Sequence, residues 1–331
     1  MFKNKTILID GGSGSWGNEL TKQLLLKNPK KIIIFSRGEF AQVNMQRKFN
    51  NKIIEYVIGD IRDAEAVDRL FSNNNIDYVF HLAALKHVPI CENLPQEAIK
   101  TNINGTINLI NSAIKYKIKY FIDVSTDKSV SPNNLYGLTK AVGEKLTIQA
   151  NNLTTDTNFV CIRGGNVLGS NGSVVPYFID QIKTNNKITI TSNIMTRFFL
   201  TLSEAIELLF QAVENSIGGE TFVMNMPSFY IKDLGKALVD YYGNKDTIIE
   251  EVGIREGEKI HEVLISEHES QKSYIFNENY FIILPSIKIN KDYSHIEKNK
   301  KVNFIEFSSA DNIKDENYLY KLLMNGGFLK K

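Results

Sequence analysis

The sequence predicts an α/β fold, a doubly wound parallel sheet covered by helices on both faces and followed by a smaller C-terminal region. Short apolar runs alternate with segments of helical periodicity through the first half of the chain, as strands and helices do in such a sheet. A glycine-rich turn directly follows the first apolar run. After about residue 165 the alternation loosens, so we place one domain at 1–165 and a second region at 166–331, with some of its segments returning to the first domain.

Each predicted strand is a short apolar run bounded by glycine or polar residues, which is typical of buried parallel strands. In chain order, the predicted strands cover residues 5–10, 31–35, 53–58, 77–82, 120–124 and 158–162. Apolar residues at helical spacing predict helices at residues 18–25, 64–71, 105–115, 202–213 and 231–241. A further helix is expected to carry residues 136–148.

The bulk composition excludes several classes of protein. Of 331 residues, 43% are hydrophobic and 23% are charged, as in ordinary globular proteins. The net charge of +2 gives no reason to expect a nucleic-acid partner. No apolar run could span a bilayer and no signal peptide is recognisable, so we expect a cytoplasmic protein with no membrane partner. Cys91 and Cys161 have no disulfide or metal spacing, so no metal site is expected.

The glycine-rich turn, Gly-Gly-Ser-Gly-Ser-Trp-Gly at residues 11–17, lies between the first predicted strand and the first predicted helix. Glycines permit a tight turn there and let a pyrophosphate approach the N-terminus of the helix. In this context the turn is a dinucleotide-binding fingerprint and indicates a Rossmann-type sheet. The candidate cofactor-binding residues of the turn are Gly11, Ser13, Gly14, Ser15, Trp16 and Gly17.

The ends of the second and third predicted strands bear on the choice of cofactor. An NAD site usually carries an acid after the second strand, but this chain has Ser36 and Arg37. An arginine can pair with a 2′-phosphate, which favours NADP over NAD. After the third strand, Asp60 can accept a hydrogen bond from an adenine amine, with Ile61 beside it. The alternative is that Asp60 caps the following helix.

The segment after the fifth predicted strand concentrates groups that can move protons. Tyr136 and Lys140 are four residues apart and share a helix face. An ammonium beside a phenol favours the phenolate, so we expect the pKa of Tyr136 to be lowered. Thr126, Asp127 and Lys128 lie just upstream, and a bend at the strand tip is needed for neighbouring side chains to face one site. A Tyr-x-x-x-Lys spacing also occurs by chance. The catalytic interpretation of this pair therefore depends on the other motifs in the chain.

Together, these motifs resemble the extended short-chain dehydrogenases/reductases, a likeness that includes Ala83 and Ala84, the positions that would lie along the cofactor. Longer strings are similar to the UDP-N-acetylglucosamine 4,6-dehydratases of polysaccharide and flagellin glycan synthesis, in particular the C-5-inverting type of pseudaminic acid biosynthesis. Tyr136 favours that type, because retaining relatives carry Met there. The strings are residues 82–89, 125–128, 165–167, 172–176, 195–198 and 253–262, within a likeness that spans about residues 3–320.

The resemblance implies an internal redox dehydration that gives UDP-2-acetamido-2,6-dideoxy-β-L-arabino-hex-4-ulose. Tyr136 would take the proton of the C-4 hydroxyl, Lys140 would hold the phenolate and the nicotinamide ribose, and Thr126 would bind the developing carbonyl oxygen. Lys128 would be the base at C-5 and Asp127 the acid that protonates the departing C-6 hydroxyl, although these two roles can be exchanged.

The same resemblance implies contacts to the UDP-sugar and a mode of assembly. The residues expected to contact the UDP-sugar are Lys86, Asn166, Val174, Arg197, Arg255 and Glu258. A homo-oligomer is expected, either a dimer through paired helices or a hexamer built from such dimers.

Three positions depart from the family pattern. Asp10 replaces a usual Thr, and its carboxylate would be unfavourable near a pyrophosphate unless it turns away. Ala41 lies near a usual lysine that helps to hold a 2′-phosphate, and Gly164 replaces a usual Tyr, which opens the sugar site. Two other activities stay open: an enzyme that makes or consumes the 5,6-ene intermediate with a partner enzyme, and a UDP-sugar 4-epimerase, which would not need Asp127 and Lys128. A non-catalytic nucleotide sensor would not need the catalytic set.

Overall fold

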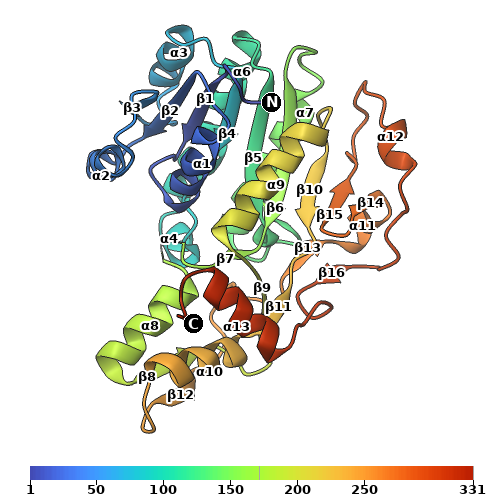
Figure 1. Cartoon of the computed structure of the whole chain (residues 1–331). Helices are drawn as coiled ribbons and strands as arrows, with labels where there is room; N and C mark the ends of the chain where they lie inside the picture. The colour runs from blue at the N-terminus through green and yellow to red at the C-terminus, as the bar shows by residue number, and fades with distance from the viewer. Residues whose placement is uncertain (171, 331) are drawn as a thin grey trace.

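The computed structural model describes residues 1–170 and 172–330. Asn171 and Lys331, which fall in the predicted C-terminal region, lie outside the described residues. The described chain has a large sheet flanked by helices, and a smaller α/β part at the bottom of the view that contains the C-terminus (Figure 1). Among the described helices, none combines the length and the apolar composition that a membrane span requires.

The large sheet confirms the predicted α/β fold. Its strand order in the described chain is β14-β15-β10-β6-β5-β4-β1-β2-β3. From β1 the sheet grows outward in two directions, so the order reverses beside β1, which is where α/β sheets bind nucleotides at their carboxyl ends. The six strands predicted from sequence are β1 (Thr6–Asp10), β2 (Lys31–Ser36), β3 (Ile54–Ile58), β4 (Tyr78–His81), β5 (Tyr120–Thr126) and β6 (Asn158–Gly164).

Three strands from later in the chain extend this sheet beyond β6. β10 (Thr221–Met224) runs parallel to β6, and β15 (Tyr280–Ile283) and β14 (Ser273–Asn277) follow as antiparallel strands. Segments on both sides of residue 165 therefore share one sheet, and the predicted domain boundary at that residue stays a prediction.

Alternate residues of the strands feed two different cores. Ile7 and Ile9 pack with α1, α2 and α9 on one face of the sheet, whereas Leu8 packs with α3, α6 and α7 on the other. The helices that cover the sheet are α1 (Ser15–Leu25), α2 (Glu39–Phe49), α3 (Ala64–Ser72), α6 (Gly105–Lys115), α7 (Leu135–Ala150) and α9 (Leu202–Asn215). Of these, α2 was not predicted, because its buried side chains are limited to Gln42 and Met45 and it shows little apolar periodicity.

The smaller part has its own apolar core, built around residues such as Phe178, Ile188 and Leu234. Its elements are α8 (Val174–Asn185), β8 (Lys187–Ile190), α10 (Ile231–Tyr242), β12 (Ile248–Glu251) and α13 (Glu316–Asn325). Short strands join it to the large sheet: β7 (Asn166–Val167), β9 (Thr196–Leu200), β11 (Ser228–Tyr230), β13 (Val263–Ile265) and β16 (Phe307–Ser308). The remaining short helices are α4 (Val88–Asn93), α5 (Pro95–Ile99), a π-helix at Lys100–Asn104, a 3-10 helix at Asp127–Ser129, α11 (Glu267–Ser270) and α12 (Ser294–Glu297).

Candidate active site

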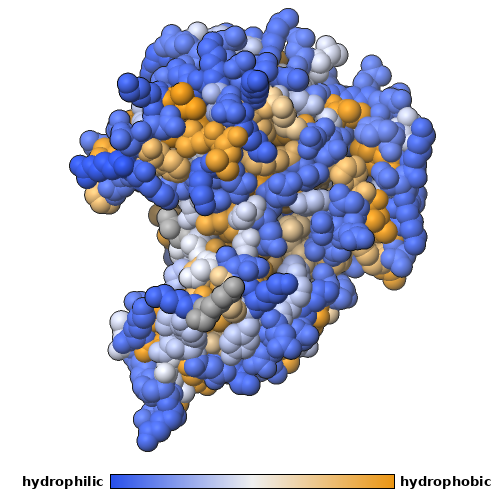
Figure 2. All heavy atoms as spheres, in the orientation of Figure 1, coloured by the Kyte–Doolittle hydropathy of each residue, from blue (hydrophilic) through white to orange (hydrophobic). Residues whose placement is uncertain are grey.

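A cavity of about 790 Å³ lies at the carboxyl ends of the parallel strands, where the surface is indented between the large and the small part (Figure 2). It gathers residues from the glycine-rich turn, from the ends of β2 to β5 and from the segment after β6. The predicted site residues that line it are Gly11, Ser13, Gly14, Ser15, Trp16, Ser36, Arg37, Asp60, Ile61, Ala83, Ala84, Lys86, Thr126, Lys128, Tyr136 and Asn166. Among the described residues, no cluster of His, Cys, Asp and Glu could hold a metal ion.

The glycine-rich turn leaves room that side chains would fill. Gly11 has a φ of +61°, and a Cβ atom there would lie 2.8 Å from the Cα atom of Ala83. A Cβ atom on Gly17 would lie 2.1 Å from the carbonyl oxygen of Gly12, so Gly17 lets α1 pack against the turn behind the cavity wall. Gly14 immediately precedes α1 as its N-cap, and it has no side chain with which to cap the first turn of this helix. This cradle fits a pyrophosphate at a helix N-terminus.

The end of β2 carries a serine and an arginine where an NAD site usually has a carboxylate. Ser36 is held by the side chain of Gln42, whose Nε2 donates to its Oγ atom at 2.9 Å, and its Oγ lies 2.9 Å from that of Ser13. Arg37 keeps half of its side chain exposed at the cavity and lies 3.7 Å from Asp60. Sequence reasoning missed Gln42, since the helix that carries it was not predicted.

The Asp60 carboxylate pairs with a neighbouring arginine and does not cap a helix. Its Oδ1 atom accepts the backbone N–H of Arg62 at 3.0 Å, and its Oδ2 accepts from Nε of Arg62 at 2.8 Å. Partial burial acts to raise the pKa of Asp60, but hydrogen bonds and charge from Arg62, with Arg37 nearby, lower it overall. The capping alternative was wrong, because Asp63 caps α3 through the N–H of Ala66. The adenine contact stays a prediction.

Asp10 turns away from the glycine-rich turn, as a carboxylate near a pyrophosphate must. Its side chain is fully buried, and Oδ1 accepts the backbone N–H groups of Leu82 at 3.0 Å and Ala83 at 2.8 Å. The same atom lies 2.9 Å from Nδ1 of His81, whose Nε2 is 2.9 Å from the Thr106 hydroxyl. The carboxylate of Asp10, where the family pattern has Thr, thus joins the end of β1 to the end of β4.

The tip of β5 bends as the sequence required. Thr126 ends the strand, and residues 127–129 form one turn of 3-10 helix that brings successive side chains together. The Thr126 hydroxyl donates to Oδ1 of Asp127 at 2.9 Å, and Nζ of Lys128 lies 3.0 Å from the same atom. Asp127 is fully buried behind the cavity wall, and within the described residues its Oδ2 atom has no hydrogen-bond partner.

Tyr136 and Lys140 lie in the first turns of α7, which Asn134 caps. Nζ of Lys140 donates to Oδ1 of Asp123 at 2.9 Å, and both groups are buried behind Tyr136. The expected lowering of the Tyr136 pKa is not the net result: burial raises it, and the nearby lysine charges offset this in part. Two physical causes oppose the expectation, the burial of the phenol and the pairing of Lys140 with a carboxylate.

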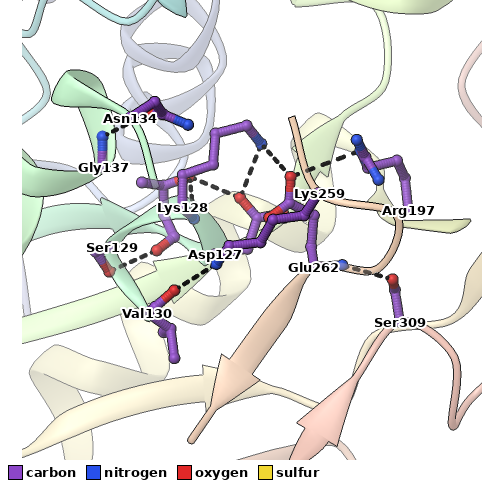
Figure 3. Close-up of polar contacts among 12 residues, drawn as sticks. Asp127, Lys128, Ser129, Val130, Asn134, Gly137, Arg197, Lys259, Glu262 and Ser309 are labelled. Atoms are coloured by element: carbon purple, nitrogen blue, oxygen red, sulfur yellow. Dashed lines mark hydrogen bonds and ion pairs between the residues drawn. The ribbon is translucent and has the colours of Figure 1, made fainter. Parts of the chain in front are cut away.

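Lys128 lies between two carboxylates, one of which the sequence analysis did not single out (Figure 3). Its Nζ is 3.6 Å from Oε1 of Glu262, and Nε of Arg197 is 3.6 Å from that same oxygen. Burial lowers the pKa of Lys128, but the Asp127 and Glu262 charges outweigh it, so the pKa is raised and the ammonium persists. Burial and the Lys128 charge lower the pKa of Lys86, which lines the cavity.

The remaining predicted substrate contacts are divided. Asn166 lines the cavity, whereas Val174, Arg255 and Glu258 do not. Val174 is the first residue of α8, behind the cavity wall. Arg255 is exposed on the loop before β13, and its N–H lies 3.4 Å from the Glu258 carboxylate. Arg197 is also not among the residues that line the cavity, and its Nη1 donates to two backbone carbonyl groups. The UDP-sugar contacts of these four residues stay predictions.

The opening expected at Gly164 is bordered by the indole of Trp16. A Cβ atom on Gly164 would lie 3.8 Å from Cη2 of that ring, at ordinary van der Waals distance. Both residues line the cavity. The indole therefore forms an aromatic wall next to the position where the family pattern has a tyrosine.

Comparison with known proteins identifies the family. The sequence profile described as "Polysaccharide biosynthesis protein" matches residues 7–284. A UDP-N-acetylglucosamine 4,6-dehydratase (inverting) from Campylobacter jejuni is 43% identical over 323 residues, which cover 94% of each chain. A UDP-glucose 4-epimerase from Rickettsia rickettsii is 40% identical, over 95% of this chain and 93% of its own.

A solved structure extends the likeness to the fold. The X-ray structure of Pen from Bacillus thuringiensis is 38% identical, with a TM-score of 0.91 over 99% of this chain and 100% of its own. The profile match covers well over half of the chain, and both sequence relatives exceed 30% identity. The chain therefore belongs to the polysaccharide biosynthesis protein family and has the fold of the extended short-chain dehydrogenases/reductases.

Proposed function

We propose that this protein is a UDP-N-acetylglucosamine 4,6-dehydratase, a hydro-lyase that inverts the configuration at C-5. The observation that carries the proposal is the grouping of Thr126, Asp127, Lys128 and Tyr136 at one strand tip, next to a glycine cradle that fits a dinucleotide. The C. jejuni relative of that name supports the same activity. The product would be UDP-2-acetamido-2,6-dideoxy-β-L-arabino-hex-4-ulose, an intermediate for pseudaminic acid or a related glycan.

The proposed cofactor is NADP rather than NAD. When bound, a nicotinamide cofactor would supply hydride chemistry, as the acceptor of the C-4 hydride and the donor of a hydride to C-6. Gly11, Gly14 and the start of α1 would hold the pyrophosphate. Arg37 would hold a 2′-phosphate, and Ser36 stands where an NAD site has a carboxylate.

The first chemical step needs a base at the C-4 hydroxyl, and Tyr136 is proposed for it. The Thr126 hydroxyl, at the tip of β5, would donate a hydrogen bond to the carbonyl oxygen as it forms. The charges of Lys140 and Lys128 oppose the effect of burial on Tyr136 and stabilise its phenolate. Lys140 keeps its charge because Asp123 more than offsets the effect of burial on its pKa, which is raised overall.

The second step removes the C-5 proton and expels the C-6 hydroxyl as water. The sequence analysis named Lys128 as base and Asp127 as acid, with exchanged roles as the alternative. We favour the exchanged roles, because two carboxylates keep Lys128 protonated and ready to donate. Asp127 would accept the C-5 proton at Oδ2, which has no partner among the described residues, once binding of the sugar exposes this buried carboxylate to the cavity. After water leaves, a proton returns to C-5 from the opposite face.

Two other activities have a specific observation in their favour. The R. rickettsii relative favours a UDP-sugar 4-epimerase. The wall formed by Gly164 and Trp16 differs from the family pattern. This difference favours an enzyme that makes or consumes the 5,6-ene together with a partner enzyme. Against an epimerase stands the pair of the buried Asp127 and the cavity-lining Lys128, for which interconversion at C-4 has no use.

The discriminating experiment is NMR of the product formed from UDP-N-acetylglucosamine in deuterated water by this protein alone. The dehydratase predicts a 6-deoxy-4-keto sugar with inverted C-5 that carries deuterium. A UDP-sugar epimerised at C-4 would establish the epimerase instead, and a product that retains a 5,6 double bond would establish the shared pathway.

The proposal extends to the assembly and the location of the protein. A homo-oligomer, as a dimer or a hexamer of dimers, is supported by exposed apolar residues on α7, including Leu138 and Val142. A cytoplasmic location stays a prediction from the sequence.

A further inference from the structure

Glu262 is a buried carboxylate that the mechanism above does not use. Its side chain is 4% exposed, in a loop that enters β13 from the C-terminal region. A buried carboxylate is costly unless a positive charge or several hydrogen bonds stabilise it. Within the described residues, its Oε2 atom has no hydrogen-bond partner. Its Oε1 atom has two cations nearby, Lys128 and Arg197.

The backbone of Glu262 is fixed independently of its side chain. Its N–H donates to Oγ of Ser309 at 2.9 Å, and the N–H of Ser309 donates to the carbonyl oxygen of Glu262 at 2.8 Å. The hydroxyl of Ser309 lies 2.7 Å from that of Thr196 in β9. Three segments that are far apart in sequence therefore hold the Glu262 carboxylate at the tip of β5 (Figure 3). They are β9, the loop before β13 and the segment that contains Ser309. A backbone fixed in this way is expected for a side chain whose position is important for function.

The two cations beside Glu262 belong to different parts of the proposed machinery. Lys128 is at the tip of β5, and Arg197 is in β9 and is one of the residues predicted to contact the UDP-sugar. Both lie 3.6 Å from Oε1, which is a charge contact without a close hydrogen bond. Without a carboxylate between them, these two mostly buried cations would repel one another.

We propose that Glu262 is a positioning residue, whose carboxylate holds the Lys128 ammonium beside Asp127 and keeps Arg197 next to it. The inference rests on the proposed function, because it concerns the same strand tip. Glu262 does not exchange a proton with the sugar. It fixes where the Lys128 proton donor stands, and it couples the C-terminal region to the catalytic turn.

The pH dependence follows from all groups that face Lys128. Asp127 and Glu262 face Lys128 and favour its ammonium form. The other charged and titratable groups that interact with it are Arg197, Lys86, Lys259 and Tyr136. Removing the Glu262 charge leaves Asp127 to oppose Arg197. The pKa of Lys128 therefore falls in Glu262→Gln. Whether Lys128 donates or accepts a proton, the limb of the pH–rate profile that reports it moves to lower pH.

The test compares Glu262→Gln with Glu256→Gln, which removes an exposed carboxylate of the same loop. We expect kcat for dehydration to fall about ten- to a hundred-fold in Glu262→Gln, as for other misplaced catalytic groups, with KM for the UDP-sugar little changed. One limb of its pH profile moves to lower pH, whereas Glu256→Gln keeps the wild-type kcat and profile. A wild-type pH profile in Glu262→Gln overturns the proposal.

A second readout is independent of turnover. Lysines labelled by reductive ¹³C-methylation are titrated by NMR, and the Lys128 signal is identified by its loss in Lys128→Arg. We expect Lys128 to titrate at lower pH in Glu262→Gln than in wild type. Equal titration of Lys128 in the two proteins overturns the inference about Glu262. This readout does not depend on the substrate. A protein that does not turn over UDP-N-acetylglucosamine would reject the proposed function, which is a separate outcome. If Glu262→Gln does not fold, Glu262→Asp, which retracts the charge by one methylene, must titrate at Lys128 at lower pH than wild type, and an unshifted signal overturns the proposal.

Discussion

The Oδ1 atom of Asp10 lies 2.9 Å from Nδ1 of His81, and both side chains are buried at the carboxyl ends of β1 and β4. The same oxygen accepts the N–H groups of Leu82 and Ala83. Gly11 packs directly against Ala83, with no room for a Cβ atom between them. The carboxylate therefore sets the spacing between the glycine-rich turn and the segment that would lie along the cofactor.

Replacing Asp10 by Ala should weaken cofactor binding as well as the fold. The variant leaves two backbone N–H groups and an imidazole without their acceptor, which typically costs about 1–3 kcal/mol for each unsatisfied buried group. Asp315→Ala is a matched control, because it removes the cap of the distant helix α13 and so costs stability far from the cavity. Calorimetric titration with NADP should show weaker binding in Asp10→Ala and wild-type affinity in Asp315→Ala. Equal affinities in all three proteins would contradict the role given to Asp10.

Replacing Arg37 by Ala should remove the preference for NADP. Losing one charged hydrogen-bonding partner costs about 1.5–3 kcal/mol, so NADP affinity should fall roughly ten- to a hundred-fold. NAD affinity should stay nearly unchanged, because NAD has no 2′-phosphate for the guanidinium to pair with. Arg47→Ala, in the exposed part of α2, is the control and should affect neither cofactor. Wild-type NAD binding tighter than NADP binding would refute the argument.

The fold was predictable where burial imposes a simple period. The strand at Ile32–Phe35 is buried on both faces, and such runs stand out as continuous apolar segments. The helix at residues 39–49 was missed, since it buries few side chains. The strands at 273–277 and 280–283 were missed for another reason. Their place in the sheet depends on pairing with a distant strand, β10, which local sequence does not reveal.

The site was predictable where a motif is continuous in sequence. The glycine-rich turn and residues 126–128 line or adjoin one cavity, as expected. Glu262 was missed as a site residue because its importance lies in proximity to Lys128, 134 positions earlier, and nothing in its own segment signals that contact. The direction of the Tyr136 pKa was wrong because burial of the phenol, which local sequence does not reveal, outweighs the charges of Lys140 and Lys128.

The exposed apolar side chains on α7 predict how copies of the chain associate. Leu138 and Val142 are 49% and 41% exposed, one helical turn apart, and Ile90 and Leu94 are exposed on the adjoining α4 segment. Glutamate at position 138 or 142 would have to be desolvated in a paired-helix interface. Light scattering should therefore give an oligomer for wild type and a smaller species for Leu138→Glu and Val142→Glu. Leu26→Glu, at an exposed position after α1, should keep the wild-type mass. A monomeric wild type would rule this interface out.

A buried ion-pair network predicts sensitivity to acid. Arg163 in β6 contacts Glu144 of α7 and Glu269 of α11 at 2.7 Å each. Burial acts to raise the pKa of Glu269, but Arg163 and the Ser266 cap outweigh it, so the pKa falls from its ordinary 4.5 to about 2. A pKa depressed in the folded state means that the unfolded chain binds protons first as the pH falls.

The stabilisation from Glu269 is thus complete above about pH 4.5 and is lost as the pH falls towards 2. A shift of that size corresponds to at most about 3 kcal/mol of unfolding free energy. Denaturant unfolding should show Glu269→Gln to be less stable than wild type at neutral pH, with the difference shrinking at acid pH. A difference that stays constant between neutral pH and pH 3 would show that the network does not act through this carboxylate.

The catalytic roles can be separated by the step at which each variant stops. Tyr136→Phe should abolish oxidation at C-4, since loss of a general base typically costs about a hundred- to ten-thousand-fold. Asp127→Asn and Lys128→Met should still oxidise C-4 but fail to expel water. These two variants should accumulate reduced cofactor on the enzyme, seen by its near-ultraviolet absorbance, and Tyr136→Phe should not. Reduction of the cofactor by Tyr136→Phe would remove Tyr136 from the role of base.

Deuterium exchange distinguishes the two proton-transfer groups. If Asp127 is the base, Lys128→Met still removes the C-5 proton of the 4-keto sugar, because its carboxylate is intact. Deuterium from the solvent should then enter C-5 without loss of the C-6 hydroxyl, whereas Asp127→Asn should show neither event. The opposite pattern, exchange in Asp127→Asn and none in Lys128→Met, would assign the base to Lys128. Since Asp127 and Glu262 hold Lys128 as an ammonium in the resting protein, we expect the first pattern.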